Sequence, residues 1–165
     1  EEMRMLIKTQ SIVDRWLPRL TDKSIDVQEK SVERLSQAAT DDPSCRDQLV
    51  PALMRIAEEP DDEWANRIPL AVLYGTDEIP KLDRSWTMAF LDFYLRLARA
   101  KRIMEEDGLK RISQILEEER PDPADPTIQA IVSYSRTRLA ENDASEARGP
   151  MFLVSDWYED MTAQK

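Results

Sequence analysis

Clustered carboxylates are the residues of this chain whose type and spacing could support chemistry. They occur in three runs, at residues 58–63, 105–107 and 117–119. Paired carboxylates can hold a divalent cation, or can divide the roles of general acid and general base between them. The runs have neither the regularly spaced oxygen ligands of a calcium loop nor a glycine at its turn. We therefore expect solvated turns and helix ends at these positions, with no bound metal.

The other residue types that commonly carry catalysis are scarce. Histidine is absent, which removes the commonest general base and the commonest metal ligand at neutral pH. Three glycines are too few for a glycine-rich loop that binds phosphate. The single cysteine, Cys45, would need a cationic neighbour such as Arg46 to lower its pKa, and we expect it to pack at a helix start instead. The sequence therefore predicts a protein that is not an enzyme and that binds no cofactor.

The charge balance restricts the classes of partner. The 165 residues include 33 acidic and 23 basic side chains, which gives a net charge of −10. The resulting long-range field repels phosphate backbones and anionic membrane surfaces. We expect neither nucleic acid nor a membrane as a partner. One cysteine and the lack of a long apolar run favour a cytoplasmic, intracellular protein without disulfides.

Basic residues are nevertheless gathered in two places along the chain. The first group is Arg15, Arg19 and Lys23, and the second is Arg96, Arg99, Lys101, Arg102, Lys110 and Arg111. One interpretation makes these groups the contact for an acidic partner peptide or, less readily, for a phosphate backbone. The other, which we favour, pairs them within their helices with acidic residues such as Glu105, Glu106 and Glu117.

The elements that must position these residues are predicted to be helices throughout. Apolar residues recur at helical spacing, which indicates seven or eight helices and no strand. A capping carboxylate at Asp26 predicts the start of one helix, and Asp-Pro pairs at 42–43 and 125–126 predict two more. A helix of about 20 residues is expected to begin after Asp83, with Gly108 marking its end.

Two consecutive segments share one layout: a helix with an internal proline, an acidic turn and a second amphipathic helix. The prolines belong to Leu17-Pro18 and Val50-Pro51, and the second helices begin near Val27 and Trp64. Over residues 12–74 this layout resembles the HEAT and armadillo-like families of stacked helix pairs. The resemblance implies a curved right-handed stack whose second helices line a concave surface for protein partners. An irregular helical bundle is the alternative architecture within the all-α class.

The expected organisation is a HEAT-like domain at residues 1–140, a polar linker at 141–150 and an aromatic tail segment at 151–165. The tail either folds back to cap the last helices or docks into a partner as a short helix. Its anchors in a partner would be Phe152, Trp157 and Tyr158. The other three tryptophans lie in apolar stripes, so we expect them in the core.

Further partner-binding positions are polar residues opposite the apolar stripes of the two second helices. They are Glu29, Glu33, Arg34, Gln37, Asn66 and Arg67. The sequence as a whole predicts a non-catalytic protein–protein interaction module that acts as an adaptor or as a subunit of a larger, multi-subunit assembly. Two alternatives remain open: a fragment of a longer solenoid scaffold, and a nucleic-acid-processing enzyme built on a HEAT-like scaffold.

Overall fold

The protein is described from a computed structural model that covers residues 1–59, 63–74, 84–100, 105–141 and 146–163. Every regular element within these ranges is a helix, so the prediction of an all-α protein is confirmed. None of the described helices has the length and apolarity needed to cross a membrane. The chain divides into two compact units, Glu1–Pro80 and Lys81–Lys165, each with its own buried core.

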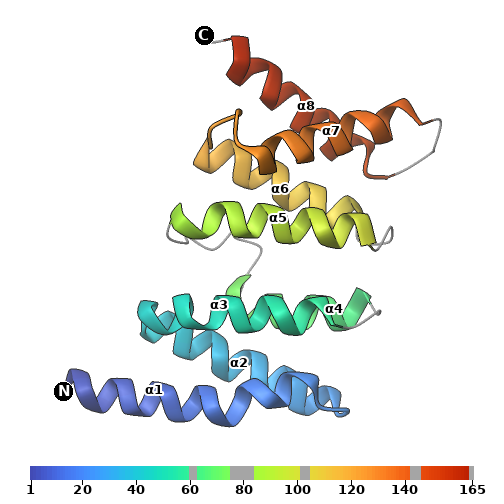
Figure 1. Ribbon diagram of the computed structural model, residues 1–165. Coiled ribbons are helices and arrows are strands. Elements are labelled where there is room, and N and C mark those ends of the chain that lie inside the picture. The colour runs from blue at the N-terminus through green and yellow to red at the C-terminus, as the bar shows by residue number, and fades with distance from the viewer. Residues whose placement is uncertain (60–62, 75–83, 101–104, 142–145, 164–165) are drawn as a thin grey trace. The chain divides into compact units, whose positions relative to one another are not determined.

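The first unit is built around one central helix (Figure 1). Its described elements are α1 (Glu2–Trp16), the 3-10 helix η1 (Leu17–Thr21), α2 (Ile25–Asp41), α3 (Pro43–Glu58) and α4 (Glu63–Tyr74). Helix α2 contacts α1, α3 and α4, so it lies at the centre of the unit. The core includes Leu35 and Ala38 of α2 and Val50, Leu53 and Ala57 of α3, all buried.

The helix starts in this unit follow from side chains that accept free backbone amides. Ser24 caps α2, since its Oγ accepts the amide of Val27 at 3.5 Å. Asp26 lies in the first turn of the helix instead, so the cap predicted there was wrong by two residues. Asp42 caps α3 and Pro43 follows it, which confirms the start predicted from that pair.

The prolines affect α1 and α3 differently. Helix α1 ends at Trp16, and the chain tightens into η1, which contains Pro18. Proline has no amide hydrogen, so it cannot extend the hydrogen-bond ladder of α1. Pro51, in contrast, lies inside α3, which continues across it. The tight turn matters for the site because it brings Arg19 back beside the ring of Trp16.

The second unit consists of two helix pairs that pack on each other (Figure 1). Its described elements are α5 (Arg84–Ala100), α6 (Glu105–Glu119), α7 (Pro126–Ala140) and α8 (Arg148–Ala163). Helix α5 contacts α6 and α7, and α8 contacts α6 and α7. The core contains Leu91 and Phe93 of α5, Ile112 and Leu116 of α6, Ile128 and Ile131 of α7, and Val154 of α8.

Gly108 lies inside α6 and does not end the preceding helix, which corrects the sequence prediction. A Cβ at this position would lie 3.2 Å from the backbone oxygen of Tyr94 and 3.5 Å from the Cβ of Ala98. The bare backbone of α6 therefore packs directly on α5, and this contact is what requires a glycine. The helix expected from Asp83 ends at Ala100 within the described residues, and Asp83 itself lies outside them.

Helix α8 begins at Arg148, inside the segment that we expected to be a linker. Ala147 is buried just before it, and Nη1 of Arg148 donates to the backbone oxygen of Leu139 at 3.3 Å. The buried side chains of α8 are Met151, Val154 and Trp157. Residues 142–145 of the expected linker lie outside the described residues. The tail thus folds back on α6 and α7, as in the first of the two alternatives considered for it.

Candidate functional site

A groove between α1 and α2 gathers apolar and cationic side chains on one concave surface. Its volume is about 290 Å³. The residues that line it are Ser11, Ile12, Arg15, Trp16 and Arg34. The first four share one face of α1 because they recur at helical spacing, and Arg34 projects from α2. We refer to these five residues as the α1–α2 groove.

Trp16 is the aromatic centre of the α1–α2 groove. Its ring is half-buried, and two guanidinium groups lie near its faces. The Cζ atom of Arg15 is 5.2 Å from the ring centroid, and that of Arg19 is 4.7 Å from it. Both distances are within the range of a cation–π interaction, which holds a long side chain in place without neutralising its charge. The arginines are therefore positioned but remain able to bind an anion.

The two arginines of the α1–α2 groove, and Arg19 beside it, are not paired with carboxylates in the described part of the chain. Within the described part of the chain, Arg15, Arg19 and Arg34 form no ion pair with an acidic side chain. The acidic neighbours in sequence are engaged elsewhere. Asp14 accepts a hydrogen bond from Gln10 at 2.9 Å, and Glu33 pairs with Lys30 at 3.6 Å. In a chain of net charge −10, this is a local concentration of unpaired positive charge.

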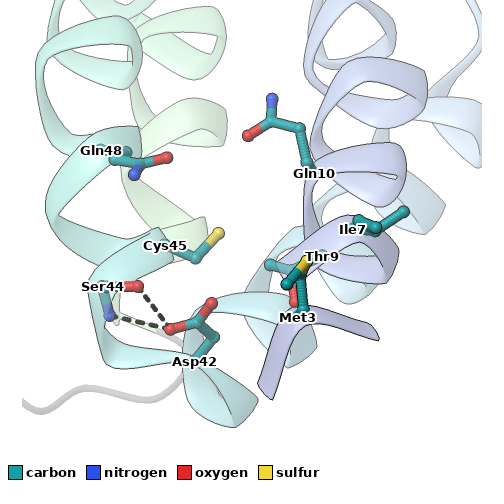
Figure 2. Close-up of a pocket in the computed structure, with 8 residues that line it drawn as sticks. All are labelled: Met3, Ile7, Thr9, Gln10, Asp42, Ser44, Cys45 and Gln48. Atoms are coloured by element: carbon teal, nitrogen blue, oxygen red, sulfur yellow. Dashed lines mark hydrogen bonds between the residues drawn. The ribbon is translucent and has the colours of Figure 1, made fainter. Parts of the chain in front are cut away.

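A second cavity, of about 260 Å³, lies between the first half of α1 and the start of α3 (Figure 2). The residues that line it are Met3, Ile7, Thr9, Gln10, Asp42, Ser44, Cys45 and Gln48. Asp42 is occupied as the cap of α3, since one carboxylate oxygen accepts from the Ser44 amide at 3.1 Å and from its hydroxyl at 2.7 Å. Met3 and Ile7 are largely exposed at the rim.

Cys45 points from α3 into this second cavity (Figure 2). Burial raises the pKa of its thiol, and the negative charge of Asp42 raises it further. Both causes favour the protonated thiol, whereas a nucleophile needs the thiolate. Arg46 is partly buried, and that burial lowers the pKa of its guanidinium. The arrangement is that of a packing cysteine, as the sequence suggested.

A buried ion cluster joins the start of α6 to α7. Arg138 donates to the carboxylate of Glu105 through two nitrogens, each 2.8 Å from an oxygen. Tyr134 also donates to Glu105, and Glu141 accepts from the same guanidinium. Glu105 and Arg138 are almost fully buried, so the expectation that the 105–107 run is solvated was wrong for Glu105.

Sequence reasoning missed this cluster, although one signal was available. The apolar stripe of α7 runs through Ile128, Ile131 and Ser135, and the next position on that face is Arg138. A charged residue at a core position of a stripe predicts a buried partner of opposite charge.

For the second basic group, we favoured pairing with acidic residues of the same helix. Arg96 shows this pairing, since its Nε donates to a carboxylate oxygen of Asp92 at 2.9 Å.

The predicted partner-binding residues of α2 are at the surface but are dispersed. Glu29, Glu33, Arg34 and Gln37 are all exposed, opposite the buried stripe of α2. Of these four residues, Arg34 lines the α1–α2 groove. Gln37 donates to Asp41 at 2.9 Å.

The two predicted residues of α4 are described to different extents. Arg67 is exposed, and it makes at least one further polar, ionic or ring contact. The side chain of Asn66 lies outside the described residues, as do Lys101 and Arg102 of the second basic group.

The predicted anchors of the tail divide between core and surface. Trp157 is only 8% exposed, so we correct its assignment as a partner anchor: it packs in the core of the second unit. Tyr158 is held by α7, since Gln129 donates to its hydroxyl at 3.0 Å and Arg136 lies 5.2 Å from its ring centroid. Phe152 stays 50% exposed, and its neighbour Leu153 is 55% exposed. Trp16 and Trp86, expected in the core, are both less buried than Trp157.

The remaining chemistry is sparse. Among the described residues, no group of three or more histidine, cysteine or acidic side chains is arranged to hold a metal ion. No family model matches the sequence, and neither a curated protein nor a solved structure matches the chain. The features of the chain that bear on its function are therefore the packing of the helices and the α1–α2 groove.

Proposed function

We propose that this chain is a non-catalytic protein–protein interaction module made of HEAT-like helix pairs, acting as an adaptor or as a subunit of a larger assembly. The observation that carries the proposal is the α1–α2 groove. It exposes Trp16 and Ile12 beside arginines without carboxylate partners. Tryptophan and arginine are the side chains most enriched at the energetic centres of protein interfaces. A surface of this composition is suited to burial against another protein.

The order of helix contacts supports a stacked arrangement in each unit. In a stack of helix pairs, the two helices of a pair contact each other, and at least one of them contacts helices of the neighbouring pair. In the first unit, α2 contacts both α3 and α4. In the second, α5 contacts α6 and α7, and α6 contacts α8. These contacts support HEAT-like pairing within each unit.

The state of the reactive side chains supports a role without catalysis. The pKa of Cys45 is raised by burial, which leaves the thiol protonated at neutral pH. Glu105 is occupied by Arg138 and Tyr134, so it is not free to act as a general base. Each group is used in packing or in a helix contact.

The proposal is tested by affinity capture from a lysate of the source cells, followed by quantitative mass spectrometry. The baits are the wild-type chain and the variants Trp16→Ala, Arg34→Glu and Arg55→Glu. Arg55 is exposed on α3 and does not line the groove, so it controls for the change in net charge. Circular dichroism and thermal unfolding show that each bait is folded.

We expect a protein that the wild-type and Arg55→Glu baits enrich equally and that both groove variants lose. Loss of one large interface side chain or one charge contact typically weakens binding at least about tenfold. If no protein depends on Trp16 and Arg34, the groove is not the binding surface and the proposed function fails.

A further inference from the structure

We infer that the α1–α2 groove binds an acidic segment of its protein partner, one in which carboxylates flank a single bulky apolar side chain. The inference rests on the proposed function and narrows the class of partner. It follows from three features of the groove: its unpaired charge, its apolar surface and its size.

The charge comes from guanidinium groups that are positioned for an anion. Trp16 holds Arg15 and Arg19 through its ring, and Arg34 faces the groove from the neighbouring helix. A guanidinium group binds a carboxylate through two parallel hydrogen bonds, and this geometry favours aspartate and glutamate. Asp14 bonds Gln10 and Glu33 pairs with Lys30, and no acidic side chain in the described part of the chain pairs with these arginines.

The apolar surface and the volume define the second element of the ligand. Ile12 and the half-buried ring of Trp16 line the groove beside the arginines. Its volume of about 290 Å³ is just below the roughly 300–1,000 Å³ of small-molecule pockets. A groove of this size accommodates one large side chain, while the rest of an extended segment lies over the rim. An acidic segment with one aromatic or long aliphatic residue meets both requirements.

The net charge of the chain favours a peptide over a nucleic acid. Screening limits the attraction of the arginines to about 8 Å at physiological ionic strength, so it acts only inside the groove. A short segment with a few carboxylates can be confined to that region. A nucleic acid carries a continuous line of phosphates, which would extend beyond the groove and lie close to the surface of a chain whose 33 acidic side chains outnumber its 23 basic ones.

The test is a fluorescence anisotropy titration of the full chain with a short fluorescein-labelled peptide in which glutamates flank one phenylalanine. Two control peptides replace the phenylalanine by serine or the glutamates by glutamines. The protein variants are Arg15→Glu, Arg34→Glu and Trp16→Ala, with Arg55→Glu as the matched control. A labelled single-stranded oligonucleotide is titrated in parallel.

We expect the acidic aromatic peptide to bind and each control peptide to bind more weakly. Each groove variant should weaken binding at least about tenfold, because it removes a charge-assisted contact or the aromatic surface. Arg55→Glu should leave the affinity unchanged, and added salt should lower it. The inference is overturned if the peptide does not bind, if the groove variants bind it as the wild type does, or if the oligonucleotide binds more tightly.

Failure of the inference can be distinguished from failure of the proposed function. The acidic peptide is added as a competitor to the affinity capture. Suppose that capture of a partner requires Trp16 and Arg34 but that the peptide does not displace this partner. The inference of an acidic ligand is then wrong, while the proposed interaction module is still supported. Absence of any partner that depends on the groove contradicts the module itself.

Discussion

At Glu105 the second unit buries a full negative charge at the start of a helix. The arrangement is tolerated because Arg138 bonds both carboxylate oxygens and Tyr134 supplies a further donor. Removing charges from water is costly, and their mutual attraction offsets this cost only when the geometry is complete. The cluster therefore holds α6 and α7 in one arrangement. Removing one of the two charges should lower the free energy of unfolding more than removing both.

We expect Arg138→Met to lower the free energy of unfolding by about 3–5 kcal/mol, since it removes two charge-assisted hydrogen bonds from the buried carboxylate of Glu105. The double variant Glu105→Gln with Arg138→Met should recover most of this loss, because no unpaired charge remains. Urea unfolding followed by circular dichroism measures both values. A double variant less stable than Arg138→Met would contradict the account of the cluster.

The hydroxyl of Tyr94 presents the opposite case. It is buried against Phe90 and Phe93 and has no hydrogen-bond partner in the described part of the chain. Because an unsatisfied buried hydroxyl is destabilising, Tyr94→Phe should raise the free energy of unfolding by up to about 1 kcal/mol. Tyr134→Phe is the matched control and should lower it, since that hydroxyl bonds Glu105. A lower melting temperature for Tyr94→Phe than for the wild type would show that the hydroxyl of Tyr94 has a partner.

At the scale of the elements, local signals predicted most of the helices but not their tertiary contacts. Asp42 and Asp125 were identifiable as caps because the capping bond forms within a few residues of sequence. The cap of α2 was misassigned because Ser24 and Asp26 are both suitable capping residues, and the backbone geometry decides between them.

Features that depend on a distant segment could not be predicted in the same way. Gly108 resembles a helix terminator until α5 is placed against it. Trp157 follows a polar stretch and resembles an exposed anchor until α6 and α7 are placed beside it. Of the candidate site, the sequence identified Arg34 and grouped Arg15 with Arg19. It could not show that Trp16 and Arg34 line one groove, since this requires the packing of α1 on α2.

The contact of α6 with α5 leads to a prediction about two glycines in helices. Alanine normally stabilises a helix relative to glycine by about 1 kcal/mol. At Gly108 the new Cβ would press on the backbone of Tyr94, which cannot rotate away, so we expect Gly108→Ala to be destabilising by about 1–3 kcal/mol. A Cβ built at Gly149 would have no atom within 4 Å apart from its chain neighbours and the backbone of its own helix, so Gly149→Ala should be neutral or slightly stabilising. Equal effects of the two substitutions on the melting temperature would contradict close packing at Gly108.

At the scale of the whole molecule, each compact unit contains the partners of its own core. We therefore expect fragments 1–80 and 81–165, produced separately, to be helical by circular dichroism and to unfold cooperatively in calorimetry. A fragment of residues 81–122 is the control. It lacks α7 and α8 and should not show a cooperative transition, because α5 then loses its contact with α7 and α6 loses its contact with α8. A non-cooperative 1–80 or 81–165 fragment would contradict independent folding.

The position of α8 in the second unit also bears on the order in which the protein folds during synthesis. A chain emerges from the ribosome from its N-terminus, and domains generally fold as they become complete. Every core residue that the structure describes in the first unit has emerged once residue 80 has left the tunnel. The second must wait until Val154 and Trp157 have left the tunnel, because they cover α6 and α7. Until then the apolar stripe of α6 is open to chaperones, and a ribosome stalled before Trp157 would hold a nascent chain prone to aggregation.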